Sequence, residues 1–60
     1  MNRYEVTSSI TGAVYMLEAV LAISAKAQAA RLDGAVREDG FVGMETMEKY
    51  AARLLEAPKE

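Results

Sequence analysis

The stretch SITGAVYMLEAVLAISAKAQAARLD, residues 9–33, decides the fold that the sequence predicts. It contains no proline and a single glycine, Gly12, which would lie in the first turn of a helix and do little harm there. Ser9 is a good N-cap residue, and Gly34 follows at the place where a left-handed C-cap would end a helix. We therefore predict one long helix over about residues 9–33.

The apolar residues of this predicted helix spread around well over half of its circumference. When the helix is projected at about 100° per residue, a single narrow stripe holds most of its polar side chains. That stripe consists of Thr11, Tyr15, Glu18, Ala22, Lys26 and Asp33. One neighbouring helix cannot cover so wide an apolar sector, so at least two neighbours are expected.

A second, shorter helix is predicted over about residues 44–57. Gly43 is a candidate N-cap and Pro58 would stop the helix. Its apolar residues follow the i, i+3, i+4, i+7 spacing of an amphipathic helix. They are Met44, Met47, Tyr50, Ala51, Leu54 and Leu55.

The two remaining segments are short. Residues 3–7 alternate polar and apolar side chains, as in a half-buried strand or an extended arm, so an arm over 1–8 is expected. Residues 34–43 contain glycines and an Asp39-Gly40 step that favours a turn. In this loop, residues 35–36 and 41–42 either form a tiny hairpin or one of these pairs joins the N-terminal arm. Alternatively, Phe41 and Val42 cap the open end of the helix pair, and this last interpretation is preferred.

Together these elements predict an all-α fold, with one domain over residues 1–60. The layout resembles that of many small bacterial and phage helical-hairpin proteins. A chain this short needs extra burial, so two antiparallel hairpins are expected to pair into a dimeric four-helix bundle. The expected self-association residues are Ile10, Ala13, Leu17, Val20, Leu21, Met47, Leu54 and Leu55.

The residue types limit the chemistry. Cysteine and histidine are both absent, which excludes disulfides, thiolate nucleophiles and the usual zinc sites. Glu38 and Asp39 are adjacent carboxylates, but they are too few for a metal site and are better explained by a turn. No catalytic or phosphate-binding motif is present, so we expect no enzyme activity, no cofactor and no metal.

Charge and hydropathy limit the partners and the localisation that the sequence predicts. The formal net charge of -2 argues against nucleic acid as the main partner. The longest apolar run, residues 13–23, is interrupted by Glu18 and is shorter than the about twenty residues of a membrane span. Only Arg3 is basic before Lys26, so a secretory signal is not expected and a cytoplasmic protein fits best.

These observations predict a small non-catalytic protein-protein interaction factor, such as a regulator, adaptor or inhibitor of a larger bacterial or phage protein, acting as a homo-oligomer. A purely structural oligomerisation module is one alternative. A DNA-associated transcriptional regulator is another, and it would use Arg31, Arg37, Lys49 and Arg53 across a dimer. The candidate partner-binding residues are Tyr4, Val6, Tyr15, Glu18, Phe41 and Val42.

Overall fold

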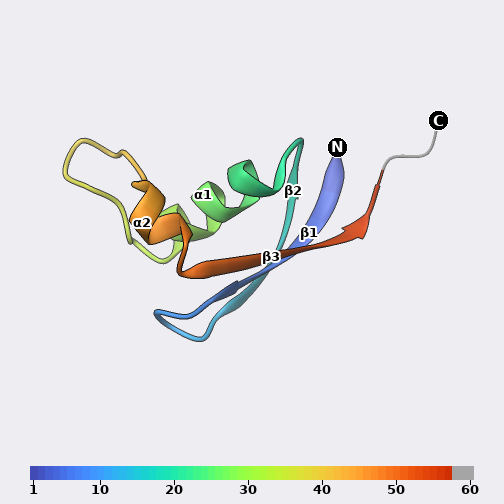
Figure 1. Ribbon diagram of the computed structural model, residues 1–60, viewed down its shortest axis with the longest axis horizontal. Helices are drawn as coiled ribbons and strands as arrows, with labels where there is room; N and C mark the ends of the chain where they lie inside the picture. The colour runs from blue at the N-terminus through green and yellow to red at the C-terminus, as the bar shows by residue number, and fades with distance from the viewer. Residues whose placement is uncertain (58–60) are drawn as a thin grey trace.

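The computed structural model describes residues 1–57 and shows a three-stranded antiparallel sheet with two helices (Figure 1). The sheet has the order β2-β1-β3, so β1 is central and the other two strands form its edges. Helix α1 lies on one side of the sheet, and the short α2 precedes β3. The elements are β1 Asn2–Ser8, β2 Val14–Ala19, α1 Ala22–Leu32, α2 Met44–Met47 and β3 Tyr50–Glu56.

A tight turn joins β1 and β2 into a hairpin. The Ser8 hydroxyl accepts hydrogen bonds from the backbone N–H groups of Ile10 and Thr11, each at 3.2 Å. Gly12 has a φ of 78°, a conformation that L side chains rarely adopt, and its N–H donates to the Ser8 carbonyl. Serine, threonine and glycine therefore form a turn here instead of the predicted helix N-terminus.

Strand β3 returns along the other side of β1. Val6 lies opposite Tyr15 of β2 and opposite Ala52 of β3, which fixes both registers. The β1–β3 register shifts between Arg3 and Tyr4, where β3 contains one extra residue. Because both edge strands run antiparallel to β1, they run parallel to each other, and the segment between them carries α1 across the sheet.

Alternation along the strands divides the sheet into a covered face and an open face. Tyr4, Val6 and Ser8 of β1 point toward α1 and are buried. Arg3, Glu5 and Thr7 lie on the open face, where Arg3 pairs with Glu18 and Glu5 pairs with Arg53. The buried apolar core contains Tyr4, Val6, Ala19, Ala25, Ala29, Ala30, Val42 and Tyr50.

Helix α1 ends in a Schellman motif. Gly34 has a φ of 75° and donates its N–H to Arg31, while Ala35 donates to Ala30 at 2.8 Å. The predicted left-handed glycine that ends the helix is thus confirmed at Gly34, directly after the C-cap residue Asp33. Gly43 is also the N-cap of α2, as predicted, although α2 spans only Met44–Met47.

The predicted all-α fold is wrong, and with it the helical hairpin and the four-helix bundle. Residues 14–19 and 50–56, both assigned to helices from the sequence, form the two edge strands of the sheet. Their apolar spacing suits a helix, but pairing with β1 satisfies their backbone groups and buries Tyr50 and Ala19. Residues 3–7 form part of a strand, which is one of the two conformations predicted for them.

The loop over residues 34–43 contains the predicted turn. Gly40 has a φ of 81°, and its N–H donates to the Arg37 carbonyl, while the Arg37 N–H donates to Phe41. Val42 is buried against the core, whereas Phe41 stays exposed with the Arg37 guanidinium 5.5 Å above its ring. Pro58, the predicted helix stop, lies outside the described residues. None of the helices within residues 1–57 is long and apolar enough to cross a membrane.

Candidate functional site

The Asp33 carboxylate lies at the centre of a polar cluster between the end of α1 and the sheet. It accepts hydrogen bonds from the hydroxyls of Tyr15 on β2 and Tyr50 on β3, the latter at 2.7 Å. Thr11, in the β1–β2 turn, donates a third hydrogen bond at 3.2 Å. One carboxylate therefore joins the helix C-terminus, both edge strands and the hairpin turn.

The protonation of this cluster follows from its hydrogen bonds. Nearby hydroxyl groups, that of Ser8 first and then those of Tyr15 and Tyr50, stabilise the negative charge and lower the pKa of Asp33 to about 2. The pKa of Tyr15 is raised, first by its hydrogen bond to Asp33, and the pKa of Tyr50 is raised first by burial. Ionised Asp33 with two neutral tyrosines is therefore the stable form at neutral pH.

The same cluster explains an otherwise unfavourable charge. A carboxylate at the C-terminus of a helix faces the negative end of the helix dipole, which destabilises it. The hydroxyl groups offset that cost, and no buried side-chain polar atom within residues 1–57 lacks a hydrogen-bond partner. The hydroxyl groups of the Asp33 cluster already donate to the carboxylate. The cluster therefore stabilises the fold and is a poor candidate for ligand binding.

The second candidate is the outer edge of β2. The Ser8 N–H donates to the Ala13 carbonyl, so residues 13, 15, 17 and 19 direct their backbone groups toward β1. Val14, Met16 and Glu18 then direct theirs away from the sheet. Of these groups, the Glu18 carbonyl accepts a hydrogen bond from the Gln28 side chain at 3.2 Å. The rest of the edge is a row of groups suited to pairing with another strand.

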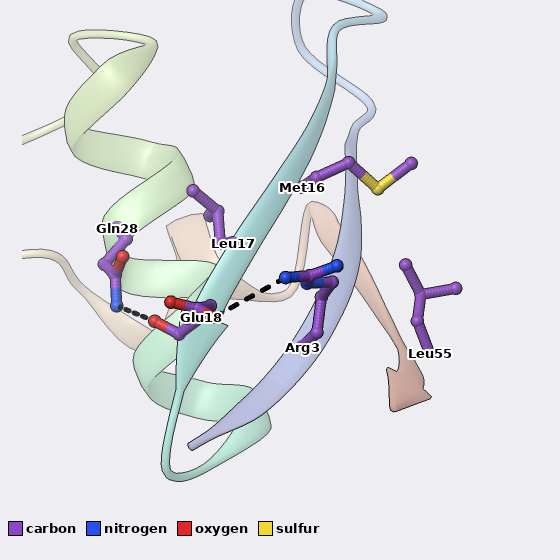
Figure 2. Close-up of a pocket in the computed structure, with 6 residues that line it drawn as sticks. All are labelled: Arg3, Met16, Leu17, Glu18, Gln28 and Leu55. Carbon is purple, nitrogen blue, oxygen red and sulfur yellow. Dashed lines mark hydrogen bonds and ion pairs between the residues drawn. The ribbon is translucent and has the colours of Figure 1, made fainter. Parts of the chain in front are cut away.

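An open depression of about 790 Å³ is lined by residues of β2, of the central strand β1, of β3 and of α1 (Figure 2). Leu17 and Gln28 flank β2 on the helix side, while Met16, Arg3 and Leu55 lie on the other side. The Arg3 guanidinium is 3.7 Å from the Glu18 carboxylate, so the charges here are locally balanced. The depression is thus lined by three apolar side chains, one amide and one ion pair.

The edge of β3 is less suited to pairing. Its extra residue interrupts the ladder opposite Arg3 and Tyr4, and Arg53 carries a charge in the middle of the strand. Bulges and central charges both discourage the addition of another strand. Strand β2 has neither feature, because its single charge, Glu18, lies near its end.

The structure scatters the residues predicted for self-association. Ile10 and Ala13 are in the hairpin turn, Val20 and Leu21 connect β2 to α1, and the remainder are spread over three other elements. Leu17 is half-buried on β2, Met47 is half-buried on α2, and Leu54 and Leu55 are exposed on β3. They do not form the single helical face that the sequence predicted.

The candidate partner-binding residues also separate. Tyr4, Val6 and Val42 are buried in the core, which removes them from the surface. Tyr15 is half-buried and donates to Asp33, while Phe41 is exposed in the loop. Only Glu18 lies at the β2 edge with its side chain exposed.

Sequence reasoning missed the residues that organise both candidates. The helical projection places Asp33 and Tyr15 on the same polar stripe. That shared position is the one feature of the sequence that could have indicated their contact. Met16 and Gln28 gave no signal, because their roles depend on which backbone groups of β2 face outward. No group of metal-binding side chains is found in the part of the chain that the structure describes.

No family model, curated protein or solved structure matches this chain.

Proposed function

We propose that this protein is a small non-catalytic protein-protein interaction factor that works as a homo-oligomer. It binds other chains through exposed apolar side chains and an open sheet edge. The predicted role as a regulator, adaptor or inhibitor is retained, but the docking element is now a strand edge.

The small core supports this proposal most strongly. Of the eight apolar residues that are buried within residues 1–57, four are alanines, and in this part of the chain Val6 is the only large apolar side chain that is completely buried. Thirteen large apolar side chains within residues 1–57 are instead exposed. A sixty-residue chain with so little apolar burial gains stability most directly by burying more against another chain.

The alternatives differ in what they require. A purely structural oligomerisation module would use the same surface but leave no apolar patch free after assembly. The DNA-associated alternative gains no support from the geometry, because Arg37 is ion-paired with Glu45 and Arg53 with Glu5. Both pairs place a carboxylate where a phosphate would have to bind.

Light scattering over a hundredfold dilution, with circular dichroism at each concentration, tests the proposal. We expect a dimer or a larger closed species that dissociates on dilution. A folded monomer at every concentration would contradict the homo-oligomer. A salt-dependent shift of duplex DNA at physiological ionic strength would favour the DNA alternative instead.

A further inference from the structure

We infer that two copies of this chain pair through their β2 edges, antiparallel, with Met16 of each copy on the two-fold axis. The result is a continuous six-stranded sheet with both α1 helices on the same face. This inference rests on the proposed function and specifies its contact surface. It follows from the outward backbone groups, the side-chain pairs and the charges of β2.

The backbone groups select the register. In an antiparallel pair of strands, every second residue directs its backbone N–H and C=O groups toward the other strand and forms a hydrogen-bonded pair with the residue opposite. Centring the pair on Met16 places Val14 opposite Glu18 of the second copy and Met16 opposite Met16. Every outward-facing residue of the strand then has a partner within the strand. The Glu18 carbonyl can keep its bond to Gln28, because a carbonyl oxygen has two lone pairs.

The side chains on both faces of the sheet are compatible with this register. On the helix side, Tyr15 lies opposite Leu17 of the second copy, and both side chains are half-buried in the monomer. On the open face, the exposed side chains of Met16 from the two copies meet at the axis. Such cross-strand pairs of apolar residues stabilise a sheet.

Charge and strand length disfavour several other symmetric pairings. Shifting the register by four residues puts Glu18 opposite Glu18, and pairing two β3 strands about Arg53 puts two guanidinium groups opposite each other. Shifting β2 by two residues moves Val14 opposite Val20, which lies beyond the strand. In the register centred on Met16, Glu18 faces Val14 and remains paired with Arg3 of its own chain.

Disulfide trapping in the full chain tests the register directly, because the chain has no cysteine of its own. In the Met16→Cys variant, the two introduced residues should lie about 5.5 Å apart between Cα atoms, within the range for a disulfide. In the matched Val14→Cys variant, the two cysteines are displaced by about 13 Å along the strands. We expect air oxidation to cross-link the first variant at least tenfold faster than the second.

A charge variant supplies an independent readout. Met16→Lys brings two ammonium groups together at the axis and should raise the dissociation constant of the dimer by at least tenfold. Ala51→Lys, on the open face of β3, should leave it within about twofold. Because both sites are exposed on edge strands, circular dichroism should show that both variants remain folded.

The outcomes separate this inference from the proposed function. A dimer that cross-links equally at both cysteines, or that weakens with Ala51→Lys and not with Met16→Lys, overturns the β2 pairing and leaves the homo-oligomer standing. A monomer by light scattering with no selective cross-linking overturns both. Selective cross-linking at position 16 together with the loss on Met16→Lys supports the pairing.

Discussion

At the residue scale, Asp33 is the side chain that ties the helix to the sheet. Three hydroxyls from different elements donate to it, and its own position as the C-cap of α1 fixes where the helix ends. The cluster therefore makes the packing of α1 depend on particular hydrogen bonds as well as on a small apolar core.

The Tyr50 hydroxyl should make a measurable contribution to stability. Tyr50→Phe removes a donor to a charged acceptor while keeping the buried ring, so we expect the free energy of unfolding to fall by about 1–2 kcal/mol. Chemical denaturation measures this change. Tyr4→Phe is the matched control, because the Tyr4 hydroxyl only accepts a bond from the Asn2 side chain. An equal loss in both variants would contradict the special role of Asp33.

Stability should also fall in acid because of Asp33. Its pKa is lowered from 3.8 to about 2 on folding, so its contribution is complete above about pH 4 and is lost as the pH falls through 2. Asp33→Asn removes that contribution. We expect the wild-type chain to be more stable than the Asp33→Asn variant at pH 7. The difference between their unfolding midpoints should narrow toward pH 2.

The pH dependence of stability in alkali tests the same cluster through its two tyrosines. The pKa values of Tyr15 and Tyr50 are raised above 10.0, so their contribution is full below pH 10 and declines above it. Asp33→Asn should lower both pKa values toward 10, seen as tyrosinate absorbance appearing at lower pH. No change in that titration would mean that Asp33 is not their partner.

At the scale of the elements, alanine sets the distance between α1 and the sheet. Ala25, Ala29 and Ala30 are fully buried, and no large side chain of α1 is buried with them. Small side chains allow the helix backbone to approach the strands closely, while the larger apolar residues Ile23 and Leu32 of α1 are exposed. The alanine face of α1 is thus the face that packs against the sheet.

Enlarging that face should therefore destabilise the fold. Ala29→Leu forces a larger side chain into a filled contact, and we expect a loss of about 1–3 kcal/mol. Ser24→Leu puts the same side chain on the exposed side of α1 and should change stability by less than about 0.5 kcal/mol. Similar effects at both sites in thermal unfolding would show that Ala29 does not face the sheet.

Prediction at this scale succeeded where the signal was local. The helix end at Gly34, the turn at Asp39-Gly40 and the N-cap at Gly43 each depend on a few neighbouring residues, and each is present. The helix assigned to residues 50–56 failed because alanine, leucine and arginine favour helices locally. Those residues form a strand because β1 offers them an edge.

At the scale of the whole molecule, folding and association are expected to be coupled. If association buries apolar surface that a single chain leaves exposed, the thermal midpoint of unfolding should rise with protein concentration. We expect that dependence in the wild-type chain and its loss in Met16→Lys, measured by circular dichroism over a hundredfold range of concentration. A midpoint independent of concentration in both chains would indicate a self-sufficient monomer.

The sequence by itself determined the helix end at Gly34, the turn at Asp39-Gly40, the N-cap at Gly43, the absence of cysteine and histidine chemistry, and the shortage of apolar burial in a chain of sixty residues. The tertiary structure alone decided that residues 14–19 and 50–56 are strands, that Asp33 faces inward and that Val14, Met16 and Glu18 form an open edge. The physical reason is that strand pairing is non-local. Val6 and Ala52 are far apart in the sequence, and their pairing satisfies backbone groups whose demand no local pattern of side chains reveals.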